Sequence, residues 1–191
     1  MPVSRNRSLR RSTSWRTLIS ESAAGGSAAS GKPLAAPILD RQELVRLHGR
    51  PRDYRLVFTN GVFDLLHRGH VASLQAARSL GDRLVVGLNS DESTRRLKGQ
   101  ARPYQSEMDR AAILASIRFV DAVTVFGEDT PEDLISRLLP DVLVKGTDYS
   151  EEQIAGAAAV RRAGGEVVLV ELEAGLSSSG LVHRIQGGGV E

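Results

Sequence analysis

Two histidines, His67 and His70, stand three residues apart and are the side chains best placed for chemistry in this sequence. At positions i and i+3 they share one face of the first turn of a helix. Gly69 between them carries no side chain, so a ligand can lie against the backbone. Imidazole groups beside the free backbone N–H groups of a helix start form a site suited to anions such as phosphate.

The histidines follow an apolar segment, residues 56–58, and a polar turn that carries Thr59, Asn60 and Gly61. A strand that runs through a glycine-containing turn into a helix is where α/β proteins hold phosphates. We expect Thr59 and Gly61 to cradle a substrate, and Asp64 to brace the turn. The pattern predicts the nucleotide-phosphate site of a transferase.

Strands and helices alternate from residue 55 onward. We expect strands at 56–58, 83–88, 122–126, 142–144 and 166–170, and helices at 71–80, 106–118, 131–139, 151–162 and 178–185. The strands are continuous Val and Leu runs, which is typical of a parallel sheet covered on both faces. The alternation predicts an α/β fold: a doubly wound, Rossmann-like parallel sheet of five strands with helices on both faces, in a single domain.

The chain is expected to divide into three parts. Residues 1–37, rich in Arg, Ser, Ala and Gly, cannot bury enough apolar surface to fold and are predicted to be a disordered basic leader. The folded domain is expected over 38–186, starting with a helix at 39–48 that Asp40 caps. Residues 187–191 are predicted to be a flexible tail.

Composition excludes several classes of function. The 191 residues include no cysteine, so there is no disulfide or thiol chemistry. Residues 1–55 carry 11 Lys or Arg against 4 Asp or Glu, whereas the rest carries 14 against 19, so the basic charge belongs to the leader and nucleic-acid binding is not expected. No apolar run approaches about 18 residues, so we expect no membrane span and a cytoplasmic protein.

A protein-built metal site is also not expected. Zinc normally takes three or four protein ligands. Beside the pair, the sequence holds only His48 and His183, and neither lies near a matching motif.

A polar loop follows the second predicted strand, at the sheet edge where active-site loops belong. Its candidate residues are Asn89, Asp91, Lys98 and Arg102. Lys98 next to Gly99 can bring an ammonium group to a phosphate, although a solvated helix end is the alternative. Arg110 is expected to hold the phosphate of the second substrate, with an ion pair on the helix surface as its alternative.

Another polar loop follows the fourth predicted strand and contains Lys145, Gly146, Asp148 and Tyr149. Tyr149 is expected to stack on a base or line a sugar pocket, the alternative being a tyrosine that packs on the surface. The last helix opens with Ser177, Ser178 and Ser179. Hydroxyls and free N–H groups at a helix start suit a triphosphate.

These motifs carry a resemblance. The run Thr-x-Gly-x-Phe-Asp-x-x-His-x-Gly-His at 59–70 resembles the signature of the HxGH nucleotidyltransferases. Within that superfamily the chain is similar, over about residues 55–185, to the adenylyltransferase domain that makes ADP-heptose. The matching segments are 59–64, Ser93-Thr94-x-Arg96-Leu97-Lys98-Gly99, Arg102-Pro103, Leu143-Val144-Lys145-Gly146-x-Asp148-Tyr149 and 177–179.

The resemblance implies that AMP passes from ATP to D-glycero-β-D-manno-heptose 1-phosphate, with Mg²⁺ carried by ATP. It implies catalytic roles for His67, His70 and Lys98. Nucleotide binding would fall on Thr59, Asn60, Gly61, Phe63, Gly69, Lys145, Gly146, Ser177, Ser178 and Ser179. Substrate binding would fall on Asp64, Asn89, Asp91, Arg102, Arg110, Asp148 and Tyr149.

The resemblance also implies partners. This domain is often fused behind a sugar kinase, which the 55 residues before the region of resemblance cannot encode, so the kinase is expected on another chain. A homodimer is expected because symmetric dimers are the commonest oligomers and are usual in this superfamily.

Two other functions stay open. One is a cytidylyltransferase that acts on glycerol 3-phosphate or another polyol or sugar phosphate, although the chain lacks the arginine which that branch carries before its serine turn. The other is a non-catalytic nucleotide-binding module.

Overall fold

The computed structural model of the protein describes residues 35–147, 154–171 and 178–187, which lie in one compact unit. Its elements are β1 (Ile38–Leu39), α2 (Arg41–His48), β2 (Leu56–Gly61), α3 (Arg68–Arg78), β3 (Arg83–Asn89), α4 (Asp91–Lys98), α5 (Glu107–Ala115), β4 (Ala122–Phe126), α6 (Glu132–Leu138), β5 (Val142–Gly146), α7 (Ala157–Arg162), β6 (Glu166–Val170) and α8 (Ser178–Ile185). Among the described helices none has the length and apolar character needed to span a membrane.

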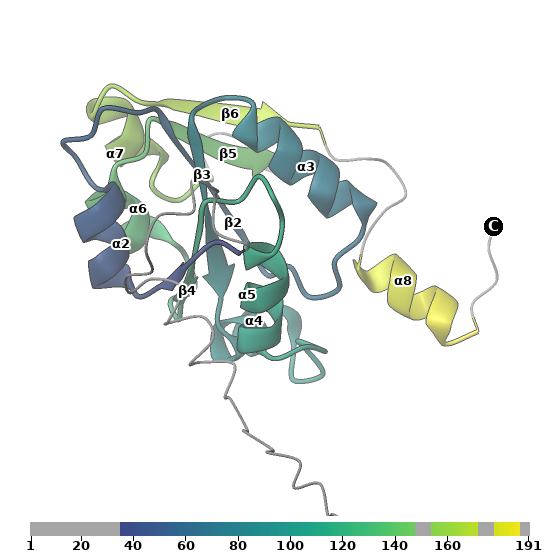
Figure 1. Ribbon diagram of the computed structural model, residues 1–191. Coiled ribbons are helices and arrows are strands. Elements are labelled where there is room, and N and C mark those ends of the chain that lie inside the picture. The colour runs from purple at the N-terminus through teal and green to yellow at the C-terminus, as the bar shows by residue number, and fades with distance from the viewer. Residues whose placement is uncertain (1–34, 148–153, 172–177, 188–191) are drawn as a thin grey trace, which may run out of the picture. The chain divides into compact units, whose positions relative to one another are not determined.

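The strands form one parallel sheet in the order β1-β4-β3-β2-β5-β6 (Figure 1). The predicted α/β fold class is therefore confirmed, but the sheet has six strands and not five. The added strand is β1, where Ile38 pairs with Val123 and Leu39 with Thr124. A two-residue strand leaves no periodic signal in a sequence, and the helical spacing places Leu39 in the helix that follows.

The polar loop predicted after β3 contains a helix, α4, that the sequence analysis did not assign. Nearly all its residues are polar, so it lacks the apolar stripe by which amphipathic helices are found. Ser90 caps it by accepting a hydrogen bond from the backbone N–H of Ser93 at 3.1 Å. Acidic residues in the first turn and basic residues in the last complement the helix dipole.

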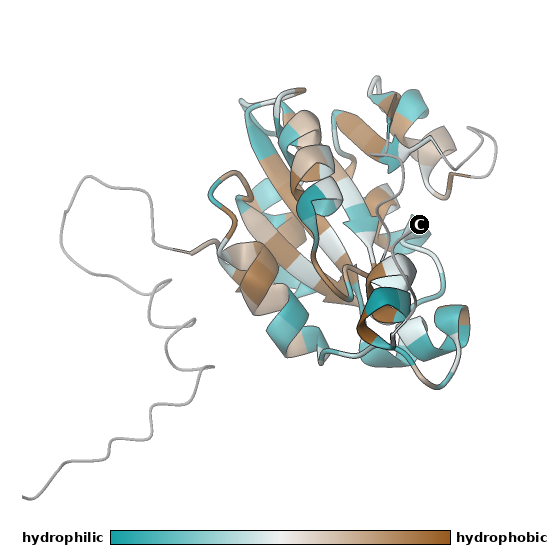
Figure 2. Ribbon diagram, turned by 90° about the vertical axis from the view of Figure 1, so that its right-hand side faces the viewer, coloured by the Kyte–Doolittle hydropathy of each residue, from teal (hydrophilic) through white to brown (hydrophobic). Residues whose placement is uncertain are grey.

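Both faces of the sheet are covered. One apolar cluster joins the sheet to α3 and α5, and the other joins it to α2, α6 and α7. Leu56, Val57 and Phe58 of β2 have no exposed surface, although they point to alternating faces. Figure 2 shows the apolar residues in the strands and on the helix sides that face them. The continuous apolar runs in the sequence are explained by this double cover.

The strand order changes direction at β2. From there the chain places β3 and β4 on one side and β5 and β6 on the other. Ligands of open α/β sheets bind beyond the carboxyl ends of the strands at such a switch point. The fold therefore predicts a ligand site at the ends of β2 and β5. The histidine motif begins at the end of β2.

Candidate active site

The turn that leaves β2 is strained. Phe63 has a φ of +47°, in the left-handed region that a bulky side chain rarely occupies. Its ring folds back over the end of the strand, where a Cβ added at Gly61 would lie 3.2 Å from it. A residue held in this region is typical of sites at which geometry serves function. The turn also brings the Phe63 ring to the first turn of α3.

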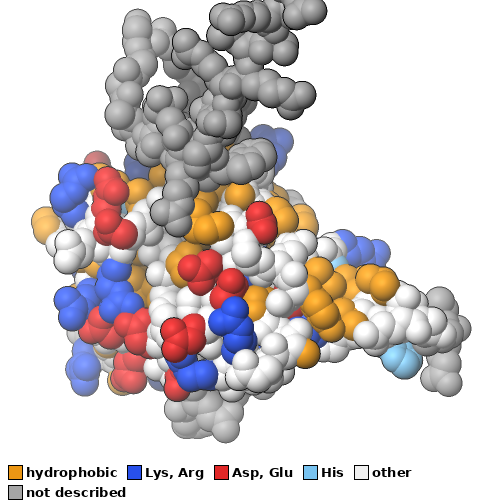
Figure 3. All heavy atoms as spheres, turned by 90° about the horizontal axis from the view of Figure 1, so that it is seen from below, with side chains coloured by type: hydrophobic (Ala, Val, Ile, Leu, Met, Phe, Trp, Pro, Cys, Tyr) orange, Lys and Arg blue, Asp and Glu red, His pale blue; other side chains and the backbone are white. Residues whose placement is uncertain are grey.

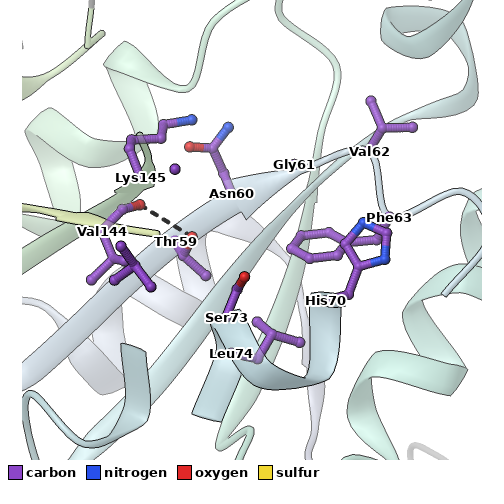
Figure 4. A pocket seen from close by; sticks show the side chains of 12 residues that line it. Thr59, Asn60, Gly61, Val62, Phe63, His70, Ser73, Leu74, Val144 and Lys145 are labelled. Carbon is purple, nitrogen blue, oxygen red and sulfur yellow. Dashed lines mark hydrogen bonds between the residues drawn. The ribbon is translucent and has the colours of Figure 1, made fainter. Parts of the chain in front are cut away.

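The two histidines lie against each other at the start of α3. Their ring centroids are 3.9 Å apart at an interplanar angle of 31°. The His70 ring also lies 5.4 Å from that of Phe63 (Figure 4). Gly69 between the histidines is buried. The sequence prediction that His67 and His70 share one face of a helix start agrees with these positions.

Both imidazoles are neutral at physiological pH. Burial lowers the pKa of His67. Burial, and next the charge of His67, lower the pKa of His70 to about 4. The backbone N–H of His67 donates to Nδ1 of His70 at 3.4 Å. Because Nδ1 accepts that bond, the single proton of His70 resides on Nε2, which can donate to a ligand.

A pocket of about 180 Å³ lies at the switch point of the sheet. Its lining comes from the ends of β2, β5 and β6, the turn after β2, and the side of α3 that faces the sheet. The lining residues are Thr59, Asn60, Gly61, Val62, Phe63, His70, Ser73, Leu74, Val144, Lys145, Gly146 and Val170. Six residues that sequence analysis placed at the nucleotide, together with His70, therefore meet in one cavity.

The polar groups of the pocket differ in their hydrogen-bond partners. The Thr59 hydroxyl already donates to the carbonyl oxygen of Val144 at 3.1 Å. Oδ1 of Asn60 is buried and has no hydrogen-bond partner in the described part of the chain. Asn60 and Lys145 both line the pocket (Figure 4). An amide and an ammonium group at this place suit a ligand with hydroxyl or phosphate oxygens.

A second cluster adjoins the pocket and is organised by Asp64. The Asp64 side chain is 3% exposed and forms an ion pair with Arg102. It also accepts hydrogen bonds from the backbone N–H groups of Tyr104 at 2.7 Å and Gln105 at 3.3 Å. Asp64 therefore braces the turn, as expected, and these contacts occupy both of its carboxylate oxygens.

The serine turn lies beside this cluster. Ser178 donates from its hydroxyl to the carbonyl oxygen of Leu65 at 3.1 Å. The hydroxyl of Ser179 accepts a hydrogen bond from Arg102 at 3.1 Å. The start of α8 thus contacts the turn that leads into the histidine pair, as a shared phosphate site requires. Neither serine lines the pocket itself.

The predicted role of Arg110 needs correction. It is 1% exposed, and all three guanidinium nitrogens are engaged within the protein. The acceptors are the carbonyl oxygens of Gln105, Val62 and Asn89 and the carboxylate of Asp91, at 2.6–3.0 Å. The predicted contact with a substrate phosphate is therefore replaced by a structural tie.

Asn89 and Asp91 belong to the same tie. Asn89 is 4% exposed, and its amide nitrogen donates to Ser93 at 2.9 Å. Asp91 pairs with Arg110 at 2.7 Å. Their side chains hold the β3–α4 junction together and are not presented to the pocket.

The remaining predicted residues lie elsewhere. Lys98 is exposed at the end of α4 and does not line the pocket. Asp148, Tyr149 and Ser177 lie outside the described residues.

Sequence reasoning also missed several lining residues. Ser73 and Leu74 follow His70 by three and four positions, so helical spacing alone would have placed them on its face. Val62, Val144 and Val170 carry no chemical signal and are found only from the structure.

Several charged side chains on the surface form ion pairs. On the face seen in Figure 3, basic and acidic side chains are interleaved. Examples are Arg41 with Asp133 at 2.8 Å and Arg96 with Asp129 at 2.6 Å. No group of three or more His, Asp or Glu that could hold a metal ion occurs in residues 35–147, 154–171 and 178–187.

Comparison with known proteins decides the family. The family model described as cytidylyltransferase-like matches residues 58–180, which span the pocket, the histidine pair and the start of α8. The chain belongs to the cytidylyltransferase-like family. It is therefore a nucleotidyltransferase, in agreement with the resemblance read from the histidine motif.

Individual relatives are more specific. Over 152 residues the chain is 55% identical to the bifunctional protein HldE of Rhodospirillum rubrum, covering 78% of this chain and 30% of that protein. It is 57% identical over 139 residues to the protein of the same name from Bradyrhizobium diazoefficiens, covering 73% and 28%. The chain thus spans less than a third of the length of these curated relatives.

Solved structures agree on the fold. The chain resembles a lipopolysaccharide core biosynthesis protein from Thermoplasma volcanium with a TM-score of 0.53 and 29% identity, covering 63% of this chain and 98% of that one. A pantoate-beta-alanine ligase from Francisella tularensis aligns with a TM-score of 0.50 and 15% identity, covering 72% and 67%, and supports the fold alone.

Proposed function

We propose that the chain transfers AMP from Mg–ATP to a heptose 1-phosphate, forming ADP-heptose and releasing pyrophosphate. The observation that carries the proposal is the pair of neutral imidazoles, 3.9 Å apart, at the edge of a pocket at the switch point of the sheet. The HldE relatives and the resemblance to ADP-heptose synthesis support the choice of nucleotide and sugar.

In this reaction a phosphate oxygen of the sugar attacks the α-phosphorus of ATP, and the bond to the pyrophosphate oxygen breaks. The nucleophile is already an anion, so no general base is needed. Catalysis then consists of placing the two phosphates in line and stabilising the charge that moves to the leaving group. Neutral N–H donors at a helix start perform that task without requiring a proton to be taken up or lost.

The side chains divide this work between them. Nε2–H of His70 donates to a phosphate oxygen of ATP, and His67 also donates to a phosphate oxygen of ATP. Ser178 through its backbone N–H, and Ser179 through its N–H and hydroxyl proton, hold the outer phosphates, and Lys98 neutralises the charge on pyrophosphate. Mg²⁺ reaches the site bound to the phosphates of ATP.

The pocket between β2 and β5 is proposed to take the remainder of the ligands. Asn60 and Lys145 offer an amide and an ammonium group to this pocket, which suit the hydroxyl and phosphate oxygens of the nucleotide that the sequence assigns to them. We also propose that a separate kinase supplies the sugar 1-phosphate, that the protein acts in the cytoplasm, and that it works as a symmetric dimer.

A panel of nucleotides and acceptors tests the proposal. The purified protein is incubated with Mg²⁺ and ATP, CTP, GTP or UTP, each with heptose 1-phosphate, mannose 1-phosphate or glycerol 3-phosphate, while pyrophosphate is measured. Release with ATP and heptose 1-phosphate alone is the expected result. Release with CTP and glycerol 3-phosphate would instead support the cytidylyltransferase that the family description names. Binding of ATP with no release in any combination would support a non-catalytic module.

A further inference from the structure

The helix α8 is held to the rest of the domain through its first turn. None of its residues is buried. Its two opening serines contact the turn after β2: Ser178 through the carbonyl oxygen of Leu65, and Ser179 through Arg102. A helix without a buried face depends on such contacts for its position, because packing of an apolar face supplies most of the stability of a helix in a protein.

Arg102 connects Asp64 with Ser179 at the start of α8. One terminal nitrogen pairs with Asp64 and the other donates to Ser179 at 3.1 Å. The Arg102 side chain is 15% exposed and that of Asp64 is 3% exposed, so the pair is shielded from solvent. Its guanidinium also lies 4.6 Å from the ring centroid of Tyr104. The planar fork of arginine suits two acceptors that a lysine ammonium on its flexible stem would not hold in the same way.

We propose that Arg102, anchored by Asp64, is a positioning residue that sets the first turn of α8 against the turn leading to His67. The serines of α8 and the histidines of α3 then close on the same phosphates. This inference rests on the proposed nucleotidyl transfer, but the position of α8 is measurable without any substrate. Arg102 was expected from sequence to bind substrate directly, and the two assignments predict different results.

Hydrogen exchange of the α8 backbone amides tests the position of the helix. Arg102→Met and Ser179→Ala are each expected to raise the exchange rates of amides in 181–185 about tenfold, which corresponds to roughly 1.4 kcal/mol. The double variant is expected to exchange no faster than Arg102→Met, because both substitutions remove the same hydrogen bond, the one between Arg102 and Ser179. Arg137→Met removes an exposed arginine of α6 and is the matched control, with unchanged exchange in α8.

Kinetics distinguish positioning from direct contact. A positioning role predicts that Arg102→Lys raises the KM for ATP nearly as much as Arg102→Met. A direct phosphate contact predicts that lysine, still a cation, keeps most of the affinity. Ser179 is exposed, so Ser179→Ala keeps the test available if Arg102→Met does not fold.

Unchanged α8 exchange in both single variants, or additive effects in the double variant, would overturn the inference. The absence of turnover with every nucleotide would overturn the proposed function alone, since the exchange data do not depend on it.

Discussion

At the scale of single residues, the protonation of the histidine pair determines what the site can do. Two imidazolium rings with centroids 3.9 Å apart would repel each other, and burial opposes the charged form of each. We therefore expect the pair to act as hydrogen-bond donors and not as cations. His70 in particular presents Nε2–H, because its Nδ1 accepts the N–H of His67. The roles of the two ring nitrogens of His70 can be tested separately by choosing the residue that replaces it.

Replacement of His70 by the two amides separates its nitrogens. Asparagine keeps an acceptor near the position of Nδ1 but has no donor at Nε2, whereas glutamine can place an N–H near Nε2. We expect His70→Asn to lower kcat by about 10²–10³-fold, the usual effect of losing one charge-stabilising donor, and His70→Gln to lower it less. Steady-state pyrophosphate release measures both, with His183→Asn on exposed α8 as control. Equal losses in the two amide variants would contradict the role of Nε2.

The lowered pKa of His70 also affects stability. The folded protein takes up this proton only near pH 4, whereas an unperturbed histidine takes it up near 6.5. The unfolded chain therefore binds more protons between these values, and the free energy of unfolding rises with pH across the window. His70→Asn has no such proton, so its urea-derived free energies should rise less between pH 4 and 6.5. Parallel curves for the two proteins would show that His70 is not buried in its neutral form.

At the scale of elements, helix starts and ends position the side chains that are proposed to act in the site. The first turn of α3 places the histidines, and α4 ends in Lys98 followed by Gly99 with a φ of +93°. A Cβ at Gly99 would meet nothing within 4 Å, so glycine is present there for its backbone conformation and not for space. Lys98 is exposed and outside the pocket, so its proposed contact with the leaving pyrophosphate depends on the reach of its long side chain.

Lys98 has a matched neighbour on the same helix. Arg95 and Lys98 are both exposed cations near the end of α4. If Lys98 contacts the leaving pyrophosphate, Lys98→Ala should lower kcat/KM by about 10²-fold, while Arg95→Ala should leave it nearly unchanged. Pyrophosphate release under limiting ATP measures the difference. Similar, small effects in both variants would indicate that Lys98 is only a solvated helix end.

At the scale of the whole molecule, one buried cation joins the segments that carry the site. Arg110 of α5 contacts the turn after β2 through Val62, the end of β3 through Asn89 and the start of α4 through Asp91. The turn after β2 and the β3–α4 junction are distant in sequence, and both contact this one guanidinium. The tie explains why a fully buried arginine is stable here: every donor nitrogen has an oxygen partner.

Loss of this tie should weaken the fold. Arg110→Met leaves the Asp91 carboxylate and three carbonyl oxygens without their donor, and breaking a buried ion pair costs about 3–5 kcal/mol. We expect a fall of that size in the free energy of unfolding, measured by urea titration. Arg137→Met, in which an exposed arginine paired with Asp133 is lost, should unfold at nearly the wild-type urea concentration. A similar midpoint for the two variants would show that the Arg110 contacts contribute little.

Residue types and their spacing were enough to predict local structure. The order Thr-x-Gly-x-Phe-Asp-x-x-His-x-Gly-His, the Val and Leu runs and the capping residue Asp40 predicted the strand-turn-helix, the parallel sheet and the first helix. Each of these signals lies within one or a few turns of chain, where residue type and spacing fix geometry. The serine turn was also found in this way, and α8 begins at Ser178 as expected.

The partners of the charged side chains depend on the fold. Arg110 is enclosed by carbonyl oxygens, whereas Arg102 joins Asp64 to Ser179. Apart from Gln105, which is 5 positions from Arg110, these partners lie 21 to 77 positions away in the chain. A charged side chain pairs with an oppositely charged or polar group that the fold brings near it. Which group that is depends on the order of the strands and the paths of the loops, and no short stretch of sequence encodes these.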